Sequence, residues 1–83
     1  MRSQQRAEID QRFLKSYRIL YADERVHMKK EFCERIGLIP QNFTLINRGD
    51  LSCTVDNLYN LADKFGVSLD WLFFGKGEFY AHA

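Results

Sequence analysis

The stretch from Lys29 to Gly49 most constrains the fold, because a glycine and a proline within it mark where one helix ends and another begins. Phe32 and Ile36 have the i, i+4 spacing of one helix face, and Cys33 lies beside them. Gly37 follows where a left-handed residue would end that helix. Pro40 suits the first turn of the next helix, because its missing N–H would have no partner there. The two predicted helices span residues 29–36 and 40–48, with a tight turn between them.

The helix over residues 40–48 has two different faces. Phe43 and Ile46 point one way and are expected to be buried. The opposite face follows the i, i+3, i+4, i+7 spacing through Gln41, Thr44, Leu45 and Arg48. Three of these four side chains are polar and none carries a carboxylate. The pattern predicts a helix anchored on one side and free to present polar groups on the other.

The length of 83 residues allows one domain with a single modest core. A hydrophobic content of 46% with one proline is typical of a folded protein. We expect a cytoplasmic protein without a membrane contact, because no run of eighteen apolar residues occurs and the chain starts without a signal-peptide core. Cys33 and Cys53 have neither a CxxC spacing nor histidines at ligand spacing, so neither a metal site nor a disulfide is predicted.

The other helices are predicted from their apolar spacing and caps. The first five residues are polar and expected to be frayed. Thr54 and Ser68 are suitable N-caps, and the expected helices span residues 6–22, 55–65 and 69–74, with a tail over residues 75–83. The apolar stripe of the helix over residues 6–22 consists of Ile9, Phe13, Tyr17, Leu20 and Tyr21, with Arg12, Lys15 and Arg18 facing outward. The apolar stripe of the helix over residues 55–65 consists of Val55, Leu58, Tyr59, Ala62 and Phe65. The expected fold is all-α, with five helices in a single domain.

The C-terminal part is rich in aromatic residues. Leu69, Trp71 and Leu72 are expected to close the core. Four further side chains exceed what so small a domain can hide, namely Phe73, Phe74, Phe79 and Tyr80. They predict a contact with a second chain, and we expect a homodimer.

The net charge of +1 is not the strongly basic balance of many nucleic-acid-binding domains. Its distribution is uneven, since residues 1–35 carry nine basic and six acidic side chains while residues 36–83 carry three and five. Such a field can orient a domain on a polyanion. Ordinary solvated helix surface explains the same distribution equally well.

The sequence resembles the phage repressor-like helix-turn-helix proteins, also called the lambda-repressor-like or xenobiotic-response-element family. The resemblance runs without a gap from Phe13 to Gly77. It is carried by Glu31, Phe32, Cys33, Gly37, Phe43, Ile46 and Gly49, and by the downstream segment LYNLADKFGVSLDWLFFGKG. It implies a five-helix DNA-binding domain whose helix over residues 40–48 enters the major groove.

In that setting the free helix face can read base edges. The amide of Gln41 can donate to and accept from adenine, and Arg48 can reach a phosphate or a guanine. Thr44 can serve a base or a phosphate, and Asn42 belongs to the same predicted set. Leu45 either touches a thymine methyl or packs partly against a neighbouring helix.

The resemblance also implies contacts outside this helix. Lys29 stands where relatives usually place a glutamine and favours a phosphate, while Ser52 and Thr54 match positions that hold the DNA backbone. The chain departs from the family in having Met28 and Ile39 at positions of capping serine or threonine, which costs each helix start roughly 1 kcal/mol. Pro40 replaces a glutamine that often reads a base.

We therefore predict a bacterial or phage transcriptional regulator, repressor-like, that binds double-stranded DNA at a palindromic operator as a homodimer. An enzyme is not predicted, because no acid, base and nucleophile gather in any recognisable motif. No cofactor and no small-molecule ligand are indicated. The alternative is a protein-interaction or antitoxin-like adaptor domain that keeps the fold, which near-neutral charge and the surplus aromatic residues favour.

Overall fold

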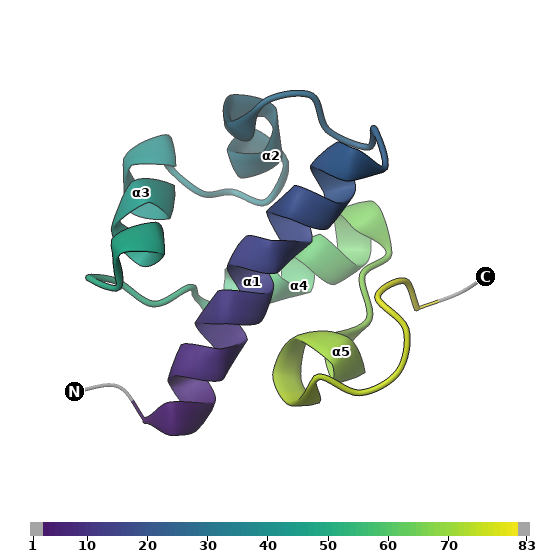
Figure 1. Ribbon diagram of the computed structural model, residues 1–83. Coiled ribbons are helices and arrows are strands. Elements are labelled where there is room, and N and C mark those ends of the chain that lie inside the picture. The colour runs from purple at the N-terminus through teal and green to yellow at the C-terminus, as the bar shows by residue number, and fades with distance from the viewer. Residues whose placement is uncertain (1–2, 82–83) are drawn as a thin grey trace.

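The computed structural model describes residues 3–81, which form five α-helices and no strand (Figure 1). The helices are α1 (Gln4–Ala22), α2 (Lys29–Arg35), α3 (Pro40–Arg48), α4 (Val55–Phe65) and α5 (Leu69–Phe74). All five lie within two residues of the predicted bounds, and the all-α prediction is confirmed. The predictions for residues 1–2 and 82–83 lie outside the described residues. None of the described helices is both long and apolar enough to cross a membrane.

The start of α1 is ordered earlier than expected. The Ser3 hydroxyl accepts a hydrogen bond from the backbone N–H of Arg6 at 3.1 Å, so Ser3 caps the helix. The prediction of a frayed start is therefore wrong for residues 3–5. A capping serine followed by good helix formers is sufficient to begin the helix at Gln4.

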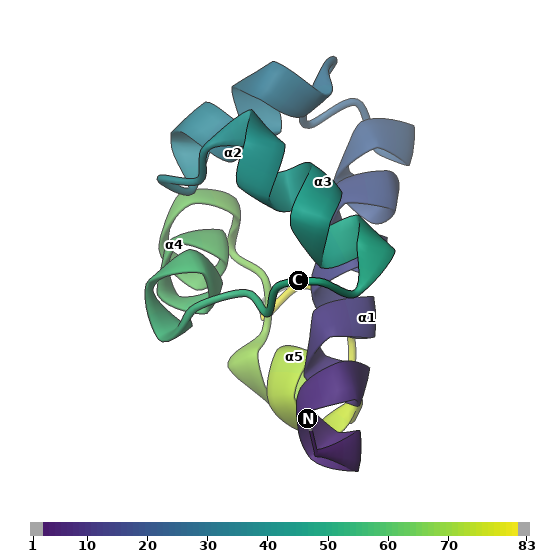
Figure 2. The ribbon, with the colours of Figure 1, turned by 90° about the vertical axis from the view of Figure 1, so that its left-hand side faces the viewer.

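The chain has one hydrophobic core, to which all five helices contribute. Helix α1 crosses in front of α4 in Figure 1, and the two helices lie on opposite sides of the molecule in Figure 2. Phe13 of α1, Phe32 of α2 and Phe43 of α3 meet in the core, with ring centroids 5.9 to 6.3 Å apart. Burying each such ring contributes about 1.5–3 kcal/mol. This cluster attaches both short helices to the long first helix.

Several residues that were predicted to lie in the core are exposed instead. Tyr21 is 54% exposed, Val55 67%, Tyr59 63% and Leu69 45%, so these core predictions are wrong. The core side of α4 contains Leu58, Leu61 and Phe65, together with Asn57, which is 4% exposed. Both sets on α4 have helical spacing. The neighbouring helices cover only one of these sides, which the spacing alone does not identify.

The segment after α5 folds back onto the chain. The N–H of Ser68 donates to the carbonyl of Phe79 and the N–H of Ala81 donates to that of Gly66, both at 2.8 Å. Phe79 also contacts Trp71, with ring centroids 4.8 Å apart. Phe79 and Tyr80 are therefore half-buried by their own chain, contrary to their expected exposure, whereas Phe74 is 69% exposed.

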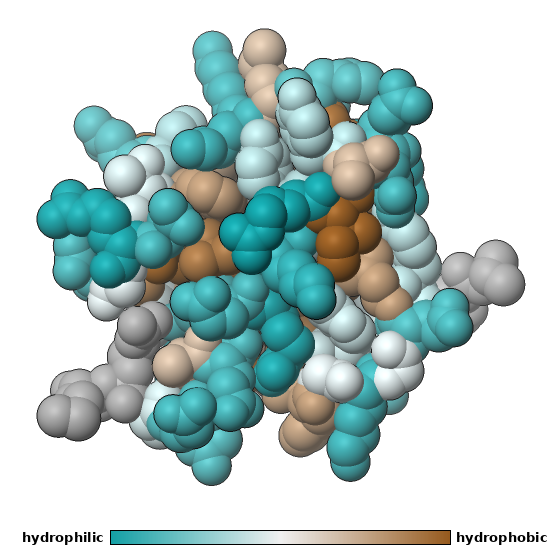
Figure 3. All heavy atoms as spheres, in the orientation of Figure 1, coloured by the Kyte–Doolittle hydropathy of each residue, from teal (hydrophilic) through white to brown (hydrophobic). Residues whose placement is uncertain are grey.

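Arg12 also differs from its prediction as an outward residue. Its guanidinium donates to the carbonyls of Leu72 at 2.7 Å and Phe73 at 2.8 Å. These carbonyls lie in the last turn of α5, where a cation is favoured by the free carbonyl groups and by the helix dipole. Arg12 therefore ties the end of α5 to α1. Figure 3 shows the face of the molecule that Figure 1 presents to the viewer. Hydrophilic residues run along the middle of this face, and hydrophobic residues reach the surface on either side of them.

Candidate nucleic-acid interface

Helix α3 lies at the outside of the molecule, and Figure 2 views it from that side. Phe43 is 5% and Ile46 1% exposed, which confirms the predicted buried face. Gln41, Thr44 and Arg48 are all exposed. The sequence-derived division of this helix into an anchored side and a free side therefore agrees with the structure.

Two members of the predicted set are less accessible. Leu45 and Asn42 are half-buried. The partial burial of Leu45 agrees with the alternative that it packs partly against a neighbouring helix. Asn42 lines a groove of about 440 Å³ together with Thr54. The hydroxyl of Thr44 lies 3.4 Å from the carbonyl of Pro40, one turn earlier in the helix. These positions leave Gln41 and Arg48 as the two longest exposed polar side chains of α3.

Arg48 has a partner that the helix pattern did not indicate. Its guanidinium forms an ion pair with the carboxylate of Asp50 at 3.0 Å, and the two side chains are 64% and 52% exposed. Asp50 lies just beyond Gly49, the left-handed residue that ends α3, so the helical spacing of α3 does not include it. The pair places a negative charge beside the main cation of this helix.

Lys29 lies close to α3 although it belongs to α2. Its ammonium nitrogen is 5.1 Å from the centre of the Phe43 ring, a cation–π contact across the two helices. Lys29 and the following Lys30 are both exposed. The start of α2 therefore places the charge of Lys29 beside α3.

The starts of α2 and α3 lack side-chain caps, as their sequences predicted. Neither Met28 nor Ile39 makes a side-chain capping bond. At α2, the Glu31 carboxylate accepts from the backbone N–H of His27 at 2.9 Å. Gly37 ends α2 with a φ of 71°, which places the N–H of Leu38 2.8 Å from the carbonyl of Cys33. The turn is thus closed by its backbone.

The loop after α3 is held by buried polar groups. Asp10 of α1 is fully buried and accepts from the backbone N–H of Cys53 at 2.9 Å. Burial, followed by the contact with Asp10, raises the pKa of the Cys53 thiol to about 12. Ser52 and Thr54 flank this anchor, the first half-buried and the second exposed. Within residues 3–81, no three cysteine, histidine or acidic side chains gather as a metal site would require.

Thr54 is the predicted N-cap of α4. Its hydroxyl accepts from the N–H of Asn57 at 3.1 Å, and its own N–H donates to the Asn57 side chain at 3.0 Å. This capping box confirms the prediction. The Thr54 hydroxyl keeps its own hydrogen, so it can still donate to an acceptor outside the protein.

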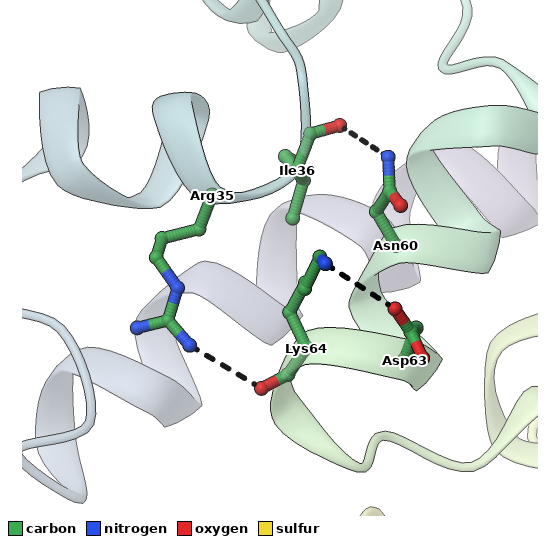
Figure 4. Close-up of polar contacts among 5 residues, drawn as sticks. All are labelled: Arg35, Ile36, Asn60, Asp63 and Lys64. Atoms are coloured by element: carbon green, nitrogen blue, oxygen red, sulfur yellow. Dashed lines mark hydrogen bonds and ion pairs between the residues drawn. The ribbon is translucent and has the colours of Figure 1, made fainter.

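The end of α2 is fastened to α4 by side chains that the sequence did not single out. The carbonyl of Ile36 accepts from the amide of Asn60 at 3.1 Å (Figure 4) and from that of Asn57 at 3.5 Å. Arg35 donates to the carbonyl of Lys64 at 3.4 Å and stacks over the Phe65 ring, 4.5 Å from its centre. These contacts fix where the turn before α3 sits relative to α4.

Comparison of the chain with protein-family models, curated proteins and solved structures finds no match. The resemblance to phage repressor-like proteins therefore stays a prediction. The functional assignment depends on the residues of α3, of the start of α2 and of the loop before α4.

Proposed function

We propose that the protein is a cytoplasmic, sequence-specific double-stranded DNA-binding regulator of the repressor type, with α3 in the major groove. The observation that carries this proposal is the free face of α3. Gln41, Thr44 and Arg48 are exposed together, while Phe43 and Ile46 anchor the opposite side of the same helix. An outward helix with amide, hydroxyl and guanidinium groups matches the donors and acceptors that base edges present.

The proposed roles follow from side-chain chemistry. Gln41 lies in the first turn of α3, and its amide suits the paired acceptor and donor of adenine. Lys29 carries a single compact charge suited to a phosphate. The hydroxyls of Ser52 and Thr54 would donate to phosphate oxygens at the edge of the interface. Arg48 would exchange Asp50 for a phosphate or a guanine.

A homodimer belongs to this proposal, because one short helix reads few base pairs and two-fold pairing suits a palindromic operator. The aromatic residues around the end of α5 are the proposed contact. Phe74 is the most exposed of them, and Phe73 is half-buried beside it. Light scattering of Phe74→Lys should show a monomer at concentrations where the wild type is dimeric. A wild type that stays monomeric at high concentration contradicts this part of the proposal.

The test of the proposed function is selection of bound duplexes from a random pool. We expect one enriched sequence with two-fold symmetry, and an affinity for it that falls as salt rises because bound phosphates release counterions. Absence of enrichment together with salt-independent retention would refute the DNA-binding proposal.

A second candidate is a protein-interaction module, and one surface favours it. Val55, Leu58, Tyr59, Leu69 and Phe73 line a shallow apolar groove of about 100 Å³ between α4 and α5. Three of them are between 45% and 67% exposed. Exposed apolar patches commonly mark protein contacts. The duplex selection separates the two candidates, since an adaptor would enrich no sequence.

A further inference from the structure

Helix α3 lies between two main-chain groups that are held by polar side chains of other helices. The carbonyl of Ile36, before α3, accepts from Asn60 and Asn57 of α4. The N–H of Cys53, after α3, donates to the buried carboxylate of Asp10 in α1. Neither α4 nor α1 supplies a residue to the free face of α3. The segments before and after α3 are therefore each held by a hydrogen-bonding side chain that lies outside the candidate interface.

These polar contacts add directional restraints to the apolar packing of α3. Phe43 and Ile46 anchor the middle of α3, but apolar contacts are non-directional. Gln41 precedes and Arg48 follows these two anchors, so a small change in the direction of α3 would move the two side chains in opposite directions. The start of α3 has no side-chain cap to resist such a change.

The side of α3 nearest α4 also lacks close packing. A groove of about 440 Å³ lies between the turn before α3 and the first turns of α4, and Gly37, Ile39, Asn57 and Asn60 are among its lining residues. At the wall of this groove, the Ile36 carbonyl accepts directly from Asn60 at 3.1 Å (Figure 4). Because hydrogen bonds depend steeply on angle, they fix a direction that apolar contacts do not fix.

We propose that Asn60 and Asp10 are positioning residues that set the direction of α3 for base recognition. This inference rests on the proposed DNA-binding function. The Ile36 contact holds the end of the helix that carries Gln41. The Cys53 contact holds the loop that contains Ser52 and Thr54. Together the two contacts keep the distance between the base-reading group of α3 and the phosphate-binding groups of the loop constant. The Asn57 side chain contributes to the first contact but also accepts from the N–H of Thr54 in the capping box of α4, so a substitution at Asn60 is easier to interpret.

The first experiment compares Asn60→Ala with Gln11→Ala, which removes an exposed amide from α1. Each variant is titrated with the best duplex from the selection and with a random duplex at the same salt. Asn60→Ala should reduce the ratio of the two affinities roughly fivefold, the factor that the net contribution of one hydrogen bond represents. Its binding to random duplex and both affinities of Gln11→Ala should be unchanged. An equal loss on both duplexes, or no loss, overturns the assignment of Asn60.

The second experiment does not use DNA. In hydrogen exchange, the amides of residues 42–48 should exchange roughly fivefold faster in Asn60→Ala, whereas those of residues 13–20 should not change. Equal acceleration of both segments would show that Asn60 only stabilises the fold. If the wild type binds no duplex, the proposed function fails, and this measurement still decides whether Asn60 orients α3.

Asp10 is tested by a conservative pair. Asp10→Asn keeps a side-chain oxygen that can accept from the Cys53 N–H, whereas Asp10→Ala does not. We expect the asparagine variant to retain the ratio of specific to random affinity and the alanine variant to lose it roughly fivefold. Equal losses in the two variants would overturn the positioning role of Asp10.

Discussion

Removing the Asp50 carboxylate should strengthen DNA binding if α3 is the recognition helix. In the free protein Asp50 holds the Arg48 guanidinium at 3.0 Å, on a largely exposed part of the surface. A duplex that approaches α3 must either break this ion pair or accept a carboxylate close to its phosphates. Asp50→Asn removes the charge and keeps nearly the same shape, so it isolates the electrostatic effect.

The expected gain follows from two small quantities. Loss of an exposed ion pair costs the folded protein about 0–1 kcal/mol, so the fold should persist. A phosphate about 7 Å from the carboxylate is repelled by about 0.6 kcal/mol in water-like surroundings, and by more where water is excluded. Relief of that repulsion should raise the affinity roughly three- to fivefold. A cation released for phosphate contact should steepen the salt dependence by about one in log–log slope.

Fluorescence anisotropy with a random duplex, at several salt concentrations, measures both effects. Asp70→Asn is the matched control, because it removes an exposed carboxylate from α5 and changes the net charge equally. We expect the control to show less than half of the gain. Equal gains in both variants would show that only net charge matters. A lower affinity for Asp50→Asn would mean that the carboxylate orients Arg48 productively, contrary to the reasoning above.

Three further predictions concern DNA recognition, the contribution of Arg12 to stability, and the pH dependence of stability. Gln41→Ala should cost about 1–3 kcal/mol on the selected duplex and relax its specificity, whereas Lys29→Ala should weaken all duplexes alike and flatten the salt slope by about one. Equal effects of both on random DNA, measured by the same anisotropy titration, would show that the two roles are misassigned. Arg12→Met should reduce the free energy of unfolding in urea by about 2 kcal/mol, because two carbonyls of α5 lose a charged donor. An unchanged urea midpoint would contradict it. The pKa of the folded Cys53 thiol is raised from 9.0 to about 12, so unfolding releases a proton in this range. The contribution of this thiol to the free energy of unfolding should be fully present below pH 9 and should fall by up to about 1.4 kcal/mol per pH unit between pH 9 and pH 12. Urea melts of Cys53→Ala should lack this part of the decline.

The helices around the turn were predictable because their ends have distinct residues. Gly37 and Gly49 both adopt a positive φ after a helix, and Pro40 begins one, so the local chemistry determined the bounds of α2 and α3. The buried side of α4 was not predictable in the same way. Val55 and Tyr59 satisfy the same spacing as the true core residues, and their exposure depends on which side α1 and α5 cover.

The polar anchors were missed for a different reason. Asp10 and Cys53 are 43 residues apart, and Asn60 lies 24 residues after its acceptor, Ile36. No local pattern links such partners, because the contact exists only after the helices have packed. One signal was present in each case, namely a short polar residue among apolar neighbours of a helix. Such residues are expected to have buried hydrogen-bond partners when they face a core.

If α3 binds DNA as proposed, the charge near it predicts weak binding by one domain and a strong dependence of affinity on dimer assembly. Two cations are predicted to contact phosphates. Lys29 lies over the Phe43 ring and is not part of the Arg48–Asp50 ion pair, whereas Arg48 would become available only when that pair opens. Two neutralised phosphates give a salt slope of about −2 for a protomer, and a two-fold dimer doubles it to about −4. At cellular salt a single protomer would therefore gain little from electrostatics. On the proposed function, useful affinity would have to come from base contacts made twice, so the direction of α3 and the pairing of two chains would limit DNA binding more than net charge does.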